Sequence, residues 1–118
     1  MALAGEPFIL YRRRSGPGLY DAILAACRGA GFAPAIVQEA PRLPATLSLV
    51  AAGLGASVVP ASMRRLAVAG VAYRTLCGCP GLSAPVRLVL RRAGASATAA
   101  RFAAAVVRLA ADPRVPSA

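Results

Sequence analysis

The 118-residue sequence contains no histidine, no lysine and no tryptophan, and its only acidic residues are Glu6, Asp21, Glu39 and Asp112. Most forms of general acid–base catalysis lack their usual groups in such a chain, so we expect that it is not an enzyme. Cysteine is also scarce, with three residues, which argues against a small disulfide-bonded scaffold. What is abundant is apolar: hydrophobic residues make up 58% of the chain. This content excludes a disordered chain, and the length leaves room for one domain.

The basic residues are all arginine, 14 in number, and they give a formal net charge of +10. Such a charge suits a nucleic-acid binder, because basic surfaces attract phosphate groups and release their counterions. Most of the arginines are scattered, however, and the only clusters are Arg12–Arg14, Arg64–Arg65 and Arg91–Arg92. A compositional bias toward arginine and alanine explains the charge equally simply. A small basic nucleic-acid-binding protein is therefore kept as an alternative function.

The uncharged stretch from Leu43 to Met63 is long enough to cross a bilayer. It is interrupted by Pro44, Gly53 and Pro60, so a helix followed by a short buried strand explains it better. The amino terminus lacks the basic segment that precedes the apolar part of a signal peptide. We therefore expect a cytoplasmic protein with free thiols and no membrane partner.

Cys77 and Cys79 are separated by a single residue and could hold a soft metal ion or form a redox pair. Metal and redox motifs usually place two residues between such cysteines, and no second pair is present. We interpret them as incidental thiols and expect neither a metal site nor a cofactor.

Short apolar runs bounded by turn residues predict five strands, at residues 8–11, 36–39, 56–59, 71–76 and 86–90. Helical spacing of apolar residues predicts helices between them, with three apolar faces. These faces are Leu19, Ile23, Ala26, Cys27 and Ala30; Leu43, Leu47, Val50 and Leu54; and Phe102, Val106 and Leu109. Residues 61–66 read as a short helix. Ser15 is the expected amino-terminal cap of the first helix, Ser96 or Thr98 that of the last, and Asp112 ends the last helix.

Alternation of strands and helices predicts an α/β fold with a mostly parallel sheet and flanking helices. Ligands of such sheets bind at the carboxyl ends of strands, near helix amino termini. The first place of this kind is the segment from Tyr11 to Leu19. Free N–H groups at a helix start favour an anion, and an arginine of Arg12–Arg14 can pair with a carboxylate.

Two glycines, Gly16 and Gly18, allow a ligand to approach the backbone of this segment closely. Ser15 has no nearby base that would activate it, so the segment predicts binding and not catalysis. An ordinary capped turn with solvated arginines is the alternative interpretation.

Five motifs follow one another along residues 6–62, within a resemblance that extends over about residues 6–111. They are Glu6–Tyr11, Gly16–Asp21, Val37–Ala40, Ser48–Gly55 and Val59–Ser62. In this order and spacing they resemble the effector-binding domain of LysR-type transcriptional regulators. The most specific part is Ser-Leu-Val-Ala-Ala-Gly-x-Gly followed by Val-Pro-Ala-Ser. The resemblance implies a partial periplasmic-binding-protein-like (type 2) fold, in which an effector occupies the cleft between two subdomains.

The function implied by the resemblance is that of a ligand-sensing fragment, which binds a small carboxylate or aromatic acid effector to modulate transcription. A fragment of a solute-binding protein of the same fold is a further alternative. The winged helix-turn-helix, the linker helix and the first subdomain precede this region in the family, so we expect DNA to be only an indirect partner. We also expect self-association, because a sheet without its partners exposes an apolar face.

The resemblance also implies a division of the chain. Residues 1–76 would be most of the second subdomain, residues 77–84 the hinge and return crossing, residues 85–112 the terminal strand and helix of the first subdomain, and residues 113–118 a tail.

The family positions that line the effector site match Pro17, Gly18, Leu19 and Leu43 in this chain. Arg14, Ser15 and Gly16 lie beside them and complete the candidate site. The chain departs from the family at Arg12, where a proline is common.

Overall fold

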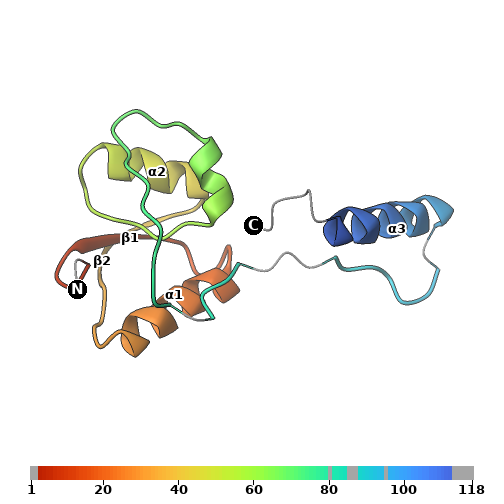
Figure 1. Cartoon of the computed structure of the whole chain (residues 1–118), viewed down its shortest axis with the longest axis horizontal. Coiled ribbons are helices and arrows are strands. Elements are labelled where there is room, and N and C mark those ends of the chain that lie inside the picture. Colours follow the sequence, from red (N-terminus) through yellow and green to blue (C-terminus); the bar gives the residue numbers. More distant parts are fainter. Residues whose placement is uncertain (1–2, 80, 85–87, 95, 113–118) are drawn as a thin grey trace. The chain divides into compact units, whose positions relative to one another are not determined.

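The computed structural model describes residues 3–79, 81–84, 88–94 and 96–112. The chain divides into two compact units, Met1–Ala84 and Pro85–Ala118. The first unit contains, in chain order, β1 (Pro7–Tyr11), α1 (Pro17–Gly29), β2 (Ala35–Ala40), α2 (Leu43–Ala51) and the short 3-10 helix η1 (Ala61–Arg65), and the second contains α3 (Ala97–Ala111) (Figure 1). The prediction of an α/β fold is confirmed.

The sheet of the first unit consists of β1 and β2, which pair in parallel. The register places Leu10 opposite Glu39 and Tyr11 opposite Ala40. After the last pair, the Arg12 amide still donates to the Ala40 carbonyl at 2.8 Å. The carboxyl ends of the two strands therefore lie side by side, as the predicted parallel sheet requires.

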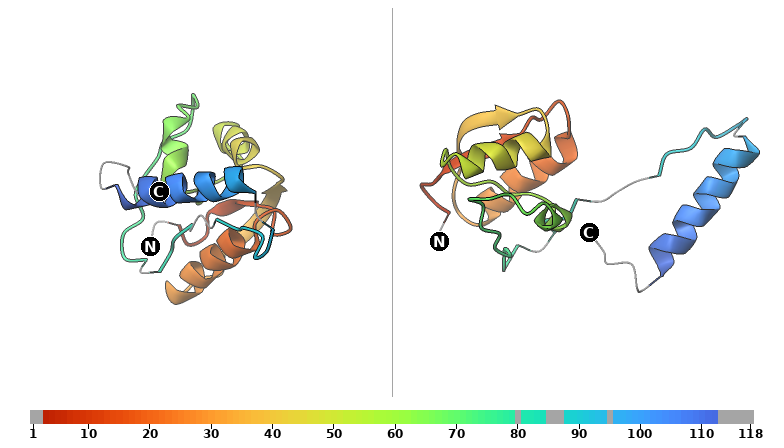
Figure 2. Two further views of the ribbon diagram at one scale, coloured as in Figure 1. Left: turned by 90° about the vertical axis from the view of Figure 1, so that its right-hand side faces the viewer. Right: turned by 90° about the horizontal axis from the view of Figure 1, so that it is seen from above.

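The core lies on both faces of β1, whose Phe8, Ile9 and Leu10 are fully buried. Phe8 and Leu10 pack with Ile23 and Cys27 of α1. Ile9 points to the opposite face, because side chains alternate along a strand. Figure 1 places α2 on one side of β1 and α1 on the other, and the further views in Figure 2 agree. Burial is also the main reason that the pKa of the Cys27 thiol is raised.

Helix α1 begins at Pro17, whose fixed φ angle suits the first helical position. The expected cap was wrong: the N-cap residue is Gly16, and no side chain caps the helix. Ser15 instead belongs to the preceding turn, where its amide donates to the Arg12 carbonyl at 2.9 Å. Its own carbonyl accepts the Tyr11 hydroxyl at 3.1 Å, so the turn is already closed without the serine side chain.

Helix α2 ends in a Schellman motif, in which the Leu54 amide donates to the Leu49 carbonyl at 3.2 Å and Gly53 has a positive φ of 79°. This end corrects the predicted apolar face of the helix. Leu47 is buried as expected, but Leu54 lies beyond the helix and is 45% exposed. The reversal of the chain at Gly53 turns Leu54 away from the line of Leu43, Leu47 and Val50.

The predicted strand at residues 56–59 is reduced to a single parallel bridge between Ala56 and Phe8. Ala56 makes both backbone bonds of this bridge, accepting from Ile9 at 2.9 Å and donating to Pro7 at 2.8 Å. Beyond it the chain leaves β1 and reaches Pro60, which has no N–H group to donate to a neighbour. The prediction was wrong for residues 57–59.

The predicted strand at residues 71–76 was wrong as well, since this segment has no regular structure. An apolar, β-favouring run becomes a strand only where a neighbour pairs with it, and no strand pairs with it in the part of the chain described. The same holds for residues 88–90, whose Val89 is 86% exposed, while residues 86–87 of that predicted strand lie outside the described residues. The prediction of a short helix at residues 61–66 is met by η1.

In the second unit, α3 confirms the predicted last helix. The Ser96 hydroxyl accepts a bond from the Ala99 amide at 3.2 Å, and Asp112 is the C-cap. None of its described side chains is buried. The predicted apolar face is therefore not a core face here, because Phe102 and Leu109 are both exposed.

Candidate site at the carboxyl ends of the strands

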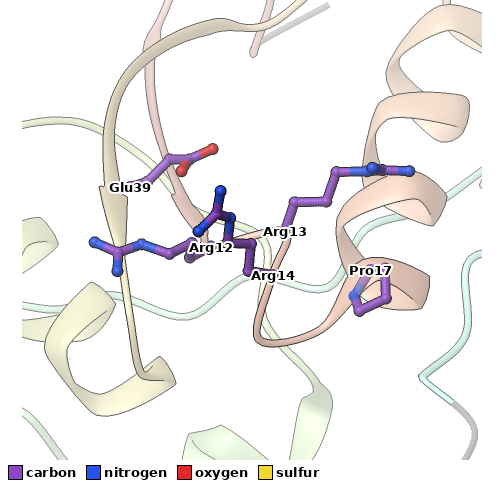
Figure 3. Close-up of a pocket in the computed structure, with 5 residues that line it drawn as sticks. All are labelled: Arg12, Arg13, Arg14, Pro17 and Glu39. Carbon is purple, nitrogen blue, oxygen red and sulfur yellow. The ribbon is translucent and has the colours of Figure 1, made fainter.

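A shallow, open hollow of about 650 Å³ lies where β1 and β2 end, and its lining is Arg12, Arg13, Arg14, Pro17 and Glu39 (Figure 3). Three elements build it. The arginines follow β1, Pro17 opens α1, and Glu39 lies opposite Leu10 near the end of β2. The hollow is thus at the edge of a parallel sheet where ligands usually bind.

Arg13 belongs to the lining, and its side chain extends toward α1 (Figure 3). Its guanidinium forms a two-pronged ion pair with Asp21, through Nε to Oδ1 at 2.9 Å and Nη2 to Oδ2 at 3.0 Å. The hydrogen bond from Arg13 is the largest influence that lowers the pKa of Asp21, and the same bond raises the pKa of Arg13. The charge of Arg13 is therefore already matched by a carboxylate of the protein.

Arg12 and Arg14 are exposed, and neither forms an ion pair or a side-chain hydrogen bond within the described residues. Two arginine charges and one Glu39 carboxylate thus face the hollow, for a local charge of about +1. Next to it, the Gly18 and Leu19 amides belong to the first turn of α1, where N–H groups have no acceptor within a helix. The site is electrostatically suited to an anion.

Glu39 has Tyr20 of α1 as its neighbour. The pKa of the Tyr20 phenol is raised, first by burial of the ring and then by the Glu39 carboxylate beside it. A phenol that stays protonated is a hydrogen-bond donor. The Tyr20 phenol and the Glu39 carboxylate therefore lie near each other at the edge of the hollow.

Of the seven predicted site residues, Arg14 and Pro17 line the hollow. Gly16 is the N-cap of α1, and Ser15 is in the turn before it. Gly18 is exposed in the first turn of α1, whereas Leu19 is half-buried and packs against the core cluster of Phe8 and Ile23.

Leu43, the seventh residue, begins α2 just beyond the end of β2 and is half-buried. The seven residues thus gather at one end of the sheet without sharing one lining.

The sequence-based site did not include Glu39, nor Arg12 and Arg13 as lining residues. A signal for Glu39 was present, since it ends an expected strand. In a parallel sheet, neighbouring strands end at the same edge, so the carboxyl end of the second predicted strand belonged beside Arg12–Arg14. The pairing of Leu10 with Glu39 is what makes this neighbourhood explicit.

A second hollow of about 410 Å³ lies between α1 and residues 78–79 and 81–82, and it is lined by small or apolar residues, among them Ala26, Cys79 and Leu82. No charged side chain contributes to its lining. Within the described ranges, no group of three or more side chains of the types that bind metal ions comes together. Nor is any helix in those ranges both long enough and apolar enough to cross a membrane.

A β1–α1–β2 unit with a cationic hollow at its strand ends is characteristic of an α/β ligand-binding domain. Residues 1–111 match the family model of the LysR substrate binding domain, and the chain belongs to this family. Membership of this family implies a periplasmic-binding-protein-like type 2 fold, and the described residues show an α/β arrangement with a two-stranded parallel sheet.

The chain is similar to several transcriptional regulators of the helix-turn-helix type. It is 40% identical over 97 residues to the regulator IlvR of Caulobacter vibrioides, an alignment that covers 82% of this chain and 32% of that protein. It is 39% identical over 74 residues to AlsR of Bacillus subtilis, covering 63% and 24% of the two chains. It is 34% identical over 94 residues to CatR of Pseudomonas putida, covering 80% and 32%. The chain therefore spans about a third or less of the length of these relatives.

Proposed function

We propose that the chain senses a small carboxylate or aromatic acid, which binds at the carboxyl ends of β1 and β2, and that it serves transcription regulation in the cytoplasm. The single observation that carries this proposal is the hollow in which Arg12 and Arg14 have no carboxylate of their own among the described residues. A guanidinium pairs with a carboxylate through two parallel hydrogen bonds, which gives both strength and orientation.

Each group of candidate residues has its own role in the proposed binding. Arg14, together with Arg12, holds the carboxylate, and the first-turn amides of Gly18 and Leu19 add hydrogen-bond donors. Ser15, Gly16 and Pro17 shape the turn, and Leu43 supplies apolar contact from the start of α2. Membership of the family supports this arrangement. The chain contributes sensing and no catalysis, and DNA is reached only through a helix-turn-helix of the kind for which the relatives are named.

Neutralising the two arginines tests the proposal. In the 118-residue chain, Arg12→Gln with Arg14→Gln should weaken binding of an aromatic or dicarboxylic acid about tenfold or more, because the charge-assisted hydrogen bonds are lost. Isothermal titration calorimetry measures the change, after a thermal-shift screen of such acids has found a ligand. Arg64→Gln with Arg65→Gln removes the same charge from η1 and should leave the affinity unchanged.

A second variant tests the glycine segment. A Cβ atom at Gly18 would meet no atom within 4 Å, so the backbone there has room for the first atom of a side chain, and Gly18→Leu is a suitable variant. It should reduce binding by obstructing the approach to the amides of α1. If the ligand binds the Arg12→Gln/Arg14→Gln variant and the Gly18→Leu variant as tightly as the native chain, the proposed site is contradicted.

A further inference from the structure

Glu39 is the feature of the hollow that binding of a simple carboxylate leaves unexplained. It lines the same hollow as Arg12 and Arg14 and is only partly exposed. Its charge repels an anionic ligand, and a carboxylate on the ligand has no proton to offer it. A site built for a plain acid would be better served by a neutral residue at this position.

The charges divide into two groups by position. Asp21 holds Arg13 on the α1 side through its two hydrogen bonds, at 2.9 and 3.0 Å. This leaves the cations of Arg12 and Arg14, which follow β1, and the carboxylate of Glu39, which comes from β2. The hollow thus offers donors from one strand end and an acceptor from the neighbouring one.

The Glu39 carboxylate also keeps free acceptor capacity. Its neighbour is the Tyr20 phenol, a single donor, whereas a carboxylate accepts about four hydrogen bonds. Within the described residues, no cation lies within ion-pair distance of Glu39. Lone pairs of Glu39 are therefore available to a donor on a ligand.

We infer that the ligand carries, beside its carboxylate, a hydrogen-bond-donating group that Glu39 accepts, as in a 2-hydroxy acid or a 2-amino acid. This inference rests on the proposed function, since it assigns the second half of the same site. Arg12 and Arg14 hold the carboxylate of the ligand, and Glu39 holds its hydroxyl or ammonium group. Glu39 then selects against acids that lack the donor, because binding them covers its remaining lone pairs without supplying a hydrogen bond to them.

Three acids with one carbon skeleton provide the test: 3-phenylpropionate, 3-phenyllactate and phenylalanine, which carry hydrogen, hydroxyl and ammonium at the same carbon. Calorimetric titration of the full chain should show that at least one of the last two binds about five- to tenfold more tightly than 3-phenylpropionate. Which of the two gains affinity distinguishes a hydroxyl donor from an ammonium donor.

Glu39→Met removes both the charge and the acceptor at similar side-chain length. It should abolish the preference, and it should strengthen binding of 3-phenylpropionate about two- to threefold because a repulsive charge is gone. Glu6→Met, which removes an exposed carboxylate just before β1 begins, is the matched control and should preserve the preference.

The outcomes separate the two proposals. Equal affinities for the three acids, or a preference that survives Glu39→Met, overturn the inference about Glu39 and leave carboxylate binding at the arginines intact. Failure of all three acids and of the wider screen to bind contradicts both.

Discussion

The ion pair between Arg13 and Asp21 decides which arginine charges face the hollow. Both side chains are more than half exposed, at 63% and 51%, so the pair contributes little to the stability of the fold. The main effect of the ion pair is on the position of the Arg13 side chain. Arg13 is committed to α1, and its neighbours in the sequence, Arg12 and Arg14, have no such partner within the described residues.

The pair predicts a pH-dependent difference between the native chain and Asp21→Asn. Because Arg13 lowers the pKa of Asp21, the pair stabilises the fold above the ordinary aspartate pKa of about 3.9. That contribution is lost as the pH falls through the lowered pKa of the folded state. Asp21→Asn should therefore melt slightly lower than the native chain at pH 7, and the two melting temperatures should converge in acid.

Thermal melts followed by circular dichroism between pH 7 and pH 2.5 measure this difference. High salt at pH 7 should also narrow it, because exposed charges are screened. A difference that is constant across the pH range would show that Asp21 stabilises the chain by something other than its charge.

Sequence reasoning identified the run of three arginines, but it did not predict which of them forms an ion pair within the protein. Arg12, Arg13 and Arg14 are chemically identical, and only the turn into α1 brings Asp21, eight residues away, next to one of them. Glu39 lies 27 positions beyond Arg12, and parallel pairing makes them neighbours. Residue types predicted an anion site, but the partner of each charge depends on the backbone path.

At the scale of elements, the Ser48–Gly55 motif has a structural explanation. Gly53 closes the Schellman motif of α2, and Gly55 then passes directly over the first residue of β1. Gly55 has a φ of 151°, and a Cβ atom built on it would collide with the Pro7 carbonyl oxygen. The glycine at this position allows Ala56 to reach the edge of β1.

Gly55→Ala should therefore destabilise the chain by about 2 kcal/mol or more, since both the strained φ and the collision oppose the native backbone. Gly18→Ala is the matched control, because a Cβ there meets no atom within 4 Å and alanine is the better helix former. It should be neutral or stabilising by about 0.5 kcal/mol. Urea denaturation followed by circular dichroism gives both values, and equal effects of the two substitutions would contradict the close approach.

The elements that sequence reasoning placed correctly are those with local signals. Pro17 at the first helical position, the Ser96 cap and apolar spacing through Ile23 and Cys27 act within one or two turns. The segments at residues 57–59, 71–76 and 88–90 have strand-like composition but no partner strand in the described ranges. A segment becomes a strand only when a second segment pairs with it through hydrogen bonds. Composition alone therefore predicted too many strands.

At the scale of the whole molecule, each unit exposes large apolar side chains. In the first unit these include Ile36 and Val37 on β2, which has no second neighbour strand in the described part of the chain. In the second unit they include Phe102, Val107 and Leu109 on α3. Apolar patches and an unpaired strand edge favour association.

We therefore expect the isolated chain to form oligomers or aggregates at micromolar concentration. Val37→Lys should shift the population toward monomer, because a charge on an edge strand opposes strand-to-strand pairing. Sedimentation velocity at several concentrations measures the effect. Arg65→Lys in η1 keeps the net charge of the chain and serves as the control. A monodisperse native monomer that melts cooperatively would contradict the expectation.

The sequence by itself determined the α/β class, the β1–α1–β2 order, the last helix and the family, because hydrophobic spacing, caps and motifs are written locally along the chain. It also predicted an anion site after the first strand, because arginines follow that strand. Tertiary structure decided what sequence could not: that Asp21 engages Arg13, that Glu39 joins Arg12 and Arg14, and that Gly55 must lack a side chain. The turn into α1 brings Asp21 to Arg13, whereas parallel pairing of β1 with β2 and with Ala56 brings Glu39 and Gly55 to their neighbours. Each of these contacts depends on the path of the backbone, which the residue types alone do not specify.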